Sequence, residues 1–370
     1  MKLGVVRAYM LKEIKEMLRS KMIVLVYLLP TMIVILFGYG IRLEVTHART
    51  VILDHDRSRL SRDLIGHFRH SKYFDTRVMN ITEQQALHRI KQARTEILII
   101  IPEGFEKRLI QGVGTEIGVF VDGAFPIRGE TMANYVEGVI FDAARRLMPP
   151  KEAKLITLDN RNLFNQAMRD ENAIVPGLIG LILLVAPAIL SALLIVKEKE
   201  EGTIFNFYSS PIKKSEFLLA KLFPAFVLHS VNIFLLFLWA TWLFEVPFRG
   251  SFTLYWFASE IYVLISLGVG LLVSIITSTQ IVATVLTIII TIIPGFLYSG
   301  MLMPISAMSA ESVIEAHIYP VMYFNHIVYD TFLVGQGLAS PKNQLYLAIL
   351  LAYALGLILL GSFLMKKELR

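Results

Sequence analysis

IYVLISLGVGLLVSIITSTQIVATVLTIIITIIPGFLYSGMLMPISAMSA, residues 261–310, is a run of fifty residues without a single Asp, Glu, Lys or Arg. A helix needs about 20 apolar residues to cross a bilayer, so the run is too long for one span. The polar cluster Thr277–Gln280 is the natural turn, which predicts spans at 252–276 and 281–299. Some of its Ile- and Thr-rich parts favour strand by propensity, but an open strand cannot satisfy its backbone in lipid, so we expect helices.

Four more uncharged stretches of about the same length as one span lie outside this run. They predict spans at 22–41, 172–196, 222–244 and 343–365. Such stretches exclude a membrane β-barrel, whose strands alternate apolar and polar residues. The first stretch exceeds the apolar core of a typical signal peptide, which favours a retained span over a cleaved leader. We therefore expect a polytopic α-helical membrane protein with six transmembrane helices.

The composition agrees with this class, because 55% of the 370 residues are hydrophobic and only 18% are charged. The net charge of +6 is compatible with nucleic-acid binding, but basic residues beside spans are typical of cytoplasmic loops, and we expect no nucleic-acid partner. These residues gather in 1–21, in the 197–221 loop and in the 366–370 tail. The positive-inside rule then places both termini in the cytoplasm and residues 42–171 outside it. The absence of cysteine leaves the redox compartment open.

Residues 1–21 carry apolar side chains at helical spacing, with basic residues between them. The apolar positions are Leu3, Val6, Met10, Ile14 and Met17. This pattern predicts an amphipathic helix on the inner membrane face. The alternative is a cytoplasmic extension of the first span.

Residues 42–171 alternate strand and helix signals and predict an α/β extracytoplasmic domain inserted after the first helix. Strands are expected at 51–53, 96–101 and 117–121. Helices are expected at 61–68, 82–93, 128–146 and 150–171. Thr82 and Gln85 form a capping-box pattern at the start of the second helix. Continuous apolar strands between helices indicate a largely covered sheet.

The motifs of common enzymes are missing. The chain has no G-x-x-x-x-G-K-[ST] loop, no H-E-x-x-H and no G-x-S-x-G, and its eight His residues lack metal-ligand spacing. Residues 210–213 match S-x-x-K, but they lie in a loop without a partner motif, and we interpret the match as chance. Asp54 and Asp56 follow a strand, where Asp is common for turn reasons. We expect no catalytic residue, no metal and no cofactor bound by this chain.

The most informative loop is KEKEEGTIFNFYSSPIKKSEFLLAKLFP, residues 197–224. It is dense in charge and broken by Gly202 and Pro211. Thr203 is placed to cap a short helix. The apolar side of this helix comprises Ile204, Phe205, Phe207 and Tyr208. An exposed apolar face beside an acidic run suits docking to a cytoplasmic partner, and the alternative is a solvated loop with interfacial aromatics.

This loop resembles that of the ABC-2 (type-2) exporter permeases, in the long form with an extracytoplasmic insert. The family pattern is E-x-E-x-G-T, a later T/S-P and a G-K. Here it corresponds to Glu198–Thr203, Ser210-Pro211 and Ala220-Lys221, with Ala220 in place of the usual Gly. Other family-like motifs are Asp54 to Arg62, Ile100 to Phe105, Val121 to Gly123, Pro176-Gly177, Ser299-Gly300 and Met303-Pro304. Each is weak alone, but together and in this order they cover nearly the whole chain.

The resemblance implies the permease subunit of an ATP-driven ABC exporter, of the multidrug type, in the bacterial inner membrane. Two ATP-binding subunits on separate chains would carry ATP and Mg²⁺, and a second permease chain, identical or different, would complete the assembly. Residues 1–21 would be the interfacial elbow helix. The 197–221 loop would couple ATP hydrolysis to transport through Glu198, Glu200, Glu201, Gly202, Thr203, Phe205 and Pro211. The insert is similar to that of exporters with a periplasmic adaptor and an outer-membrane channel, which are therefore expected partners beside membrane lipid.

Three polar residues inside the predicted spans are candidates for a substrate path: His229, Asn232 and Glu260. An intramembrane carboxylate indicates function, unless Glu260 lies at headgroup level. His229 and Asn232 are one helical turn apart and either bond another helix or line the path. Residues 300–342 are expected to form re-entrant helices of an external gate, or a folded external loop.

The apolar spans favour a hydrophobic or amphiphilic substrate. A second function fits the same topology, namely a non-transporting cell-envelope scaffold or receptor. The 197–221 loop separates the two hypotheses, because a transporter requires this loop to contact an ATPase and a scaffold does not.

Overall fold

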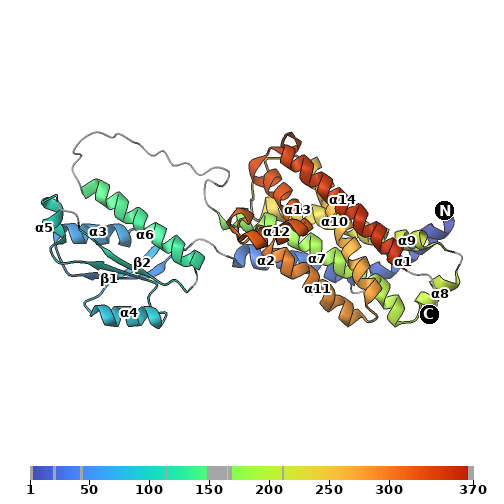
Figure 1. Ribbon diagram of the computed structural model, residues 1–370, viewed down its shortest axis with the longest axis horizontal. Helices are drawn as coiled ribbons and strands as arrows, with labels where there is room; N and C mark the ends of the chain where they lie inside the picture. The colour runs from blue at the N-terminus through green and yellow to red at the C-terminus, as the bar shows by residue number, and fades with distance from the viewer. Residues whose placement is uncertain are drawn as a thin grey trace. The chain divides into compact units, whose positions relative to one another are not determined.

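The computed structural model describes residues 3–19, 22–41, 45–112, 115–124, 126–147, 165, 169–210 and 212–365. The chain divides into two compact units (Figure 1). Residues 1–41 and 161–370 form a helical unit, and residues 42–160 form an α/β unit. Most of the helix predicted over 150–171 lies outside the described residues.

The helical unit contains long apolar helices where the sequence predicts spans. They are α2 (Met22–Gly40), α7 (Asp170–Glu200), α9 (Lys214–Leu238), α10 (Phe252–Ile276), α11 (Gln280–Leu297) and α14 (Pro341–Leu364), and a π-helical turn, Trp239–Leu243, extends α9. Five of them, α7, α9, α10, α11 and α14, are long and apolar enough to cross a membrane. The described apolar part of α2, Val26–Gly40, is shorter, so the sixth span stays a prediction. The predicted N-terminal helix is present as α1 (Leu3–Arg19) and packs against α9.

Helix α7 is the most buried of the candidate spans, and α10 and α11 pack along it (Figure 1). Small residues allow α7 and α10 to approach closely, because a side chain on Gly270 would overlap the carbonyl oxygen of Ala188. Ser191 Oγ of α7 donates to the carbonyl oxygen of Leu267 at 2.8 Å, and Ser266 Oγ of α10 donates to a carbonyl oxygen of α7 in return. Such packing and hydrogen bonding hold helices together in lipid, where the hydrophobic effect between them is weak.

Five short elements lie between α11 and α14. They are the 3-10 turns Ile305–Ala307 and Gly337–Ala339, the helices α12 (Ala310–Ile318) and α13 (Pro320–Tyr329), and the π-helical turn Asp330–Val334. Helix α13 packs against α7, α10 and α14, and its Val321, Phe324 and Ile327 are fully buried. This burial makes α13 part of the helix core, and both an external gate and a folded external loop stay predictions for residues 300–342.

The α/β unit contains a four-stranded sheet in the order β2-β1-β3-β4. β1 (Ala48–Asp54) runs parallel to β2 (Phe74–Val78) and to β3 (Ile97–Ile101), whereas β4 (Gly118–Val121) is antiparallel to β3. The sequence did not predict β2. This strand lies at the edge of the sheet, and only its first residue, Phe74, is buried, so it lacks the continuous apolar pattern of β1 and β3.

Helices cover both faces of this sheet, as the apolar strands predict. The helices are α3 (Arg59–Arg69), α4 (Glu83–Lys91), α5 (Phe105–Ile110) and α6 (Pro126–Leu147). Figure 1 shows α3 and α6 on one face and α4 on the other. Ile52 and Ile99 pack on the α3–α6 side, and Val51 and Leu98 pack on the α4 side. The predicted capping box at Thr82 opens α4.

Candidate functional site between α7 and α9

The irregular part of the predicted coupling loop is shorter than residues 197–221, because the flanking helices extend into it. Helix α7 ends at Glu200 and α9 begins at Lys214. Glu198 and Glu200 therefore lie on the last turn of α7. A helical backbone holds their side chains in place, so the acidic run is more ordered than a loop would be.

The turn after α7 begins a six-residue helix, α8 (Ile204–Ser209). The chain reverses at Gly202, whose φ of +73° is a conformation that glycine adopts without steric strain. The prediction that Thr203 caps α8 is wrong. An N-cap residue needs an extended backbone to turn its side-chain oxygen toward the first N–H groups, but Thr203 is already helical, with φ −68° and ψ −17°. Pro211, also predicted for coupling, lies outside the described residues.

A buried lysine joins three helices beside this turn. Lys221 Nζ of α9 lies 2.7 Å from Glu13 Oε1 of α1 and 2.5 Å from Glu198 Oε1 of α7. The side chains of Lys221 and Glu13 are each 3% exposed, and that of Glu198 is 12% exposed. A buried charge is tolerated only with its partners, so these residues depend on one another. Glu198 thus makes an internal contact in this chain, and its predicted coupling role stays a prediction.

The next two residues of α7 hold the turn between α10 and α11. Lys199 Nζ donates to the carbonyl oxygens of Ile275 and Thr277, each at 3.2 Å. Glu200 Oε2 accepts a hydrogen bond of 2.8 Å from the backbone N–H of Gln280. The cation meets carbonyls at the end of α10 and the anion meets the first N–H of α11, as helix dipoles favour. We call five residues the loop clamp: Glu13, Glu198, Lys199, Glu200 and Lys221.

Helix α8 has one buried face and one exposed face. Ile204 and Phe207 are 5% and 2% exposed, and the ring of Phe207 stacks on that of Phe217 with centroids 4.1 Å apart. Phe205, in contrast, is 53% exposed. The predicted apolar side of α8 is therefore divided, because two residues anchor the helix and Phe205 faces outward. Glu201, in the turn before α8, is exposed as well.

Hydrogen bonds engage two of the three residues predicted for a substrate path with other groups of the chain, and His229 lies beside one of them. Asn232 Nδ2 of α9 donates to the carbonyl oxygen of Val26 in α2 at 2.9 Å and lies 3.2 Å from Nδ1 of the fully buried His229. Glu260 Oε2 accepts a hydrogen bond of 3.0 Å from Ser230 Oγ. The bond from Asn232 joins two helices, which is the structural alternative that the sequence left open for this pair.

Three members of the loop clamp were missed as functional candidates: Glu13, Lys199 and Lys221. Glu13 lies three residues after Met10 and four before Met17, which places it within the apolar stripe of α1. An acidic residue in an apolar stripe indicates a buried partner, and this signal was available. Lys221 matched only a family motif, and no local pattern pairs it with Glu13, a residue 208 positions away.

Two of the three family-like motifs of the α/β unit, Asp54 to Arg62 and Ile100 to Phe105, meet at the carboxylate of Asp56. Asp56 Oδ1 and Oδ2 accept hydrogen bonds from the backbone N–H groups of Gly104 at 2.9 Å and Glu106 at 3.0 Å. Asp54 Oδ2 accepts from Ser61 Oγ at 2.9 Å. Both carboxylates therefore organise turns. Within the described residues, no group of three or more His, Asp or Glu side chains could hold a metal ion.

We expect Asp56→Ala to loosen α5 selectively. Burial opposes ionisation of Asp56, but hydrogen bonds from Ser58 and from backbone N–H groups outweigh it and lower the pKa of this carboxyl. Loss of such a capping carboxylate costs about 1 kcal/mol. Hydrogen exchange in residues 104–110 of the full chain should accelerate severalfold. Asp75→Ala, which removes only an exposed ion pair with Arg77, is the control, and equal exchange in the two variants would contradict the assignment.

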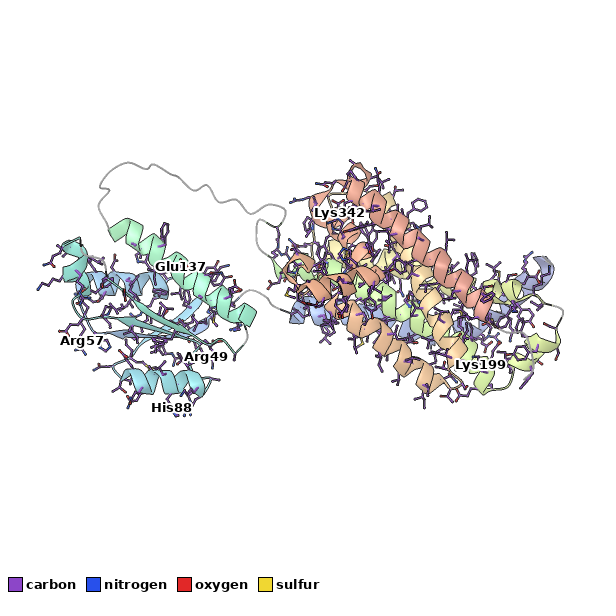
Figure 2. All side chains as sticks on the ribbon, in the orientation of Figure 1. Arg49, Arg57, His88, Glu137, Lys199 and Lys342 are labelled. Carbon is purple, nitrogen blue, oxygen red and sulfur yellow. The ribbon has the colours of Figure 1, made fainter. Side chains whose placement is uncertain are left out.

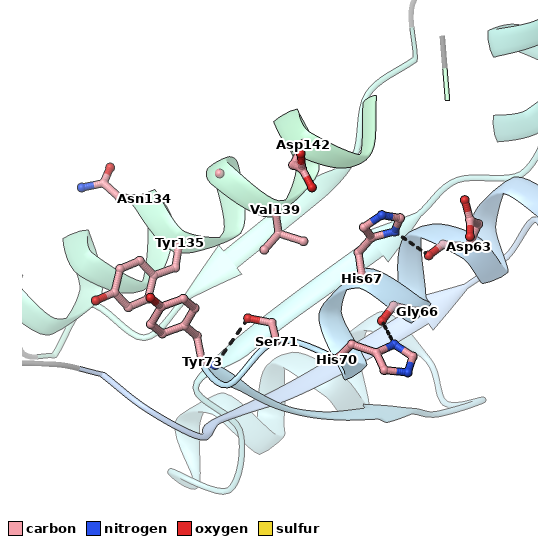
Figure 3. A pocket seen from close by; sticks show the side chains of 11 residues that line it. Asp63, Gly66, His67, His70, Ser71, Tyr73, Asn134, Tyr135, Val139 and Asp142 are labelled. Carbon is pink, nitrogen blue, oxygen red and sulfur yellow. Dashed lines mark hydrogen bonds between the residues drawn. The ribbon is translucent and has the colours of Figure 1, made fainter. Parts of the chain in front are cut away.

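A groove of about 630 Å³ lies between α3 and α6 of the same unit (Figure 3). The helices present Gly66 and Gly138 to it, and an added Cβ at either position would meet no atom within 4 Å. The rings of Tyr73 and Tyr135 close one end, with centroids 4.2 Å apart. None of the residues predicted for a site lines this groove. Its two sides are far apart in the chain, at residues 63–73 and 134–142, so no local sequence pattern indicates this groove.

Comparison with known proteins identifies the class of this chain. The ABC-2 family transporter protein model matches residues 20–363, so the chain belongs to this family. It is 30% identical over 335 residues to the probable multidrug ABC transporter permease YbhS of Escherichia coli (strain K12), covering 89% of each chain. It is 26% identical over 340 residues to the probable multidrug ABC transporter permease YbhR of the same organism, covering 90% of this chain and 91% of YbhR.

This membership defines the protein in broad terms. It is a permease subunit of an ABC transporter and a multi-pass protein of the inner membrane, consistent with its five apolar helices. Members of the family are the transmembrane subunits and not the ATPases. The family therefore implies an ATP-binding partner subunit and dimerisation.

Proposed function

We propose that this chain is the permease of an ATP-driven exporter that moves a hydrophobic or amphiphilic substrate out of the cytoplasm or inner membrane. Two separate ATP-binding subunits carry ATP and Mg²⁺, and a second permease chain, identical or different, completes the pore. Both termini and the 197–221 loop lie in the cytoplasm, which the basic residues of these segments support. The word multidrug in the names of YbhS and YbhR supports an apolar substrate.

The divided surface of α8 is the observation that carries this proposal. Phe207 anchors α8 to Phe217, while Phe205 on the same short helix is exposed. A large exposed aromatic residue on a firmly held helix is typical of an interface hot spot. The loop clamp joins α7, which precedes this helix, to α1, α9 and the α10–α11 turn. A displacement of α8 by a bound ATPase is therefore transmitted through these contacts to several membrane helices.

The α/β unit has a separate place in the proposal. By resemblance to exporters with an insert of this kind, it lies outside the cytoplasm and contacts a periplasmic adaptor that leads to an outer-membrane channel. Its covered sheet and four helices form a compact unit, as a docking domain requires.

We expect Phe205→Ala to reduce ATPase binding without loss of stability. Truncation of a central aromatic hot spot costs about 2 kcal/mol or more, which is about a thirtyfold loss of affinity. The tagged chain would be isolated in mild detergent, and the co-purified ATP-binding subunit would be quantified by mass spectrometry and by ATP hydrolysis. The apparent melting temperature of the permease should stay unchanged.

Phe207→Ala is the matched variant on the same helix. It removes a buried ring, so we expect a lower melting temperature and loss of ATPase binding as a secondary effect. If Phe205→Ala retains the wild-type amount of a functional ATPase, α8 is not the docking element. If the intact wild-type chain never carries an ATP-binding subunit, the non-transporting scaffold or receptor becomes the better hypothesis.

A further inference from the structure

The α/β unit contains the groove between α3 and α6, and the helical unit contains another cavity, at the end opposite α8. It has a volume of about 450 Å³ and is enclosed by the segment after α11 and by α12, α13 and α14. Figure 2 shows its residue Lys342 at one end of the helical unit and Lys199 of the loop clamp at the other. The buried side chains of Ser299 and Tyr346 lie deep in this cavity, which we call the distal pocket.

Basic side chains dominate the charged groups of the distal pocket. Lys342, His317 and His326 line it, and no Asp or Glu is among its lining residues in the described part of the chain. The acidic residues of the neighbouring segments have partners elsewhere. Asp330 Oδ2 accepts hydrogen bonds of 2.8 Å from Asn343 Nδ2 and from the backbone N–H of Gly337, and Glu315 accepts one from Tyr298. The lining itself therefore presents the cation of Lys342 and two imidazoles to a ligand, and the nearest carboxylate, that of Asp330, is within electrostatic range of His326 but is already hydrogen-bonded.

The geometry of these groups suits an anion with several oxygens. His317 Nδ1 lies 2.7 Å from the carbonyl oxygen of Val313 and donates to it, so Nε2 can donate to an anion when the ring is an imidazolium. The ring of His326 packs edge-on against Tyr346, with centroids 5.0 Å apart, and is held there. Lys342 lies over the ring of the same tyrosine, 5.5 Å from its centroid. His326 of α13 and Lys342 of α14 thus both lie against the ring of Tyr346.

Exposed apolar side chains lie next in sequence to three of the lining residues, Val313, His317 and Tyr346. Ile314 and Ile318 of α12 are 66% and 60% exposed, and Leu345 of α14 is 57% exposed. They occupy the same two short stretches of helix as His317 and Lys342. A free, fully hydrated anion gains nothing from such side chains, whereas the hydrocarbon part of an amphiphile is stabilised by them.

We propose that the distal pocket binds the anionic phosphate headgroup of an amphiphile whose hydrocarbon chains lie along α12 and α14. Lys342 and His317 hold the phosphate oxygens at the mouth of the pocket, and His326 and Ser299 face it from inside. Charge-assisted hydrogen bonds to phosphate supply the affinity. The inference concerns binding by this chain alone and does not require export or an ATPase partner.

The test is a binding titration on the purified full chain in detergent, without nucleotide or ATPase. The probes are dihexanoyl phosphatidylglycerol, dihexanoylglycerol, which lacks the phosphate, and inorganic phosphate. We expect saturable binding of the phospholipid only. Lys342→Gln and His317→Gln should each weaken it about tenfold, which corresponds to about 1.4 kcal/mol. Both side chains are exposed, so the fold should persist, and an unchanged melting temperature would verify this.

Lys91→Gln is the control, because it removes the same charge from an exposed position on α4. Equal phospholipid binding by wild type, Lys342→Gln and His317→Gln would overturn the proposal. Equal binding of dihexanoylglycerol would show that the phosphate is not recognised. Competition by inorganic phosphate at the same concentration as the lipid would show that the pocket binds a free anion, and it would overturn the proposal that the ligand is an amphiphile. ATPase binding through α8 is measured separately, so failure here leaves the proposed export function untouched.

Discussion

Lys221→Met is expected to destabilise the helical unit severely. The substitution removes the only cation within hydrogen-bonding distance of Glu13 among the described side chains and leaves it beside Glu198, with both carboxylates largely buried. Removal of one partner from a buried ion pair costs about 3–5 kcal/mol, because the remaining charge is uncompensated. We expect a much lower apparent melting temperature in detergent and poor recovery of the chain from membranes.

Two further variants separate charge from packing at this position. Lys197→Met breaks an exposed pair, in which Lys197 Nζ lies 3.1 Å from Glu16 Oε1, and should change stability by less than about 1 kcal/mol. Adding Glu13→Gln and Glu198→Gln to Lys221→Met should recover most of the lost stability, because neutral amides no longer repel each other. A Lys221→Met protein that melts like the Lys197→Met protein would rule out a structural role for the buried lysine.

Gly270→Ala is expected to separate α7 from α10. A single added carbon would overlap the backbone carbonyl oxygen of Ala188, and backbone cannot rotate away as a side chain can. Overpacking of this kind costs about 1–3 kcal/mol, which exceeds the gain of up to about 1 kcal/mol from better helix propensity. The apparent melting temperature should fall, and the hydrogen bond from Ser191 to Leu267 should weaken with it.

Gly356→Ala provides the matched control within a candidate span. Gly356 lies on α14, and a Cβ there would meet no atom within 4 Å. Its replacement should leave the melting temperature unchanged or raise it slightly, since only helix propensity changes. If both alanine variants melt alike, the close approach of α7 and α10 is not a determinant of stability.

The spans were predictable from the sequence because their signal is local. An uncharged run such as 261–310 can satisfy its backbone in lipid only as helix, and Thr277–Gln280 is the one polar break within it. Helices α10 and α11 accordingly end and begin at this turn. The same logic located β1 and β3, which are buried on both faces, and missed the edge strand β2.

The candidate site was less predictable because its contacts are not local. The pattern around α8 gave a helix with an apolar side, but the stacking of Phe207 on Phe217 decides which aromatic residue remains exposed. The acidic run gave no indication of its partners within the chain. Glu198 and Glu200 bond to Lys221 and to the backbone N–H of Gln280, which lie in other helices, and only the three-dimensional fold brings these partners together.

The length of α7 links the loop clamp to the thickness of the bilayer. Its 31 residues extend about 46 Å at 1.5 Å per residue, whereas the hydrocarbon core of a membrane is about 30 Å thick. About 16 Å of the helix must therefore project into the headgroup layers, or the helix must tilt. Glu198, Lys199 and Glu200 form the last residues of this projection. A thicker membrane would draw the ion pair of Glu198 and the hydrogen bonds of Lys199 and Glu200 toward hydrocarbon, so lipid composition should influence how firmly α8 is held and how readily it responds to a partner.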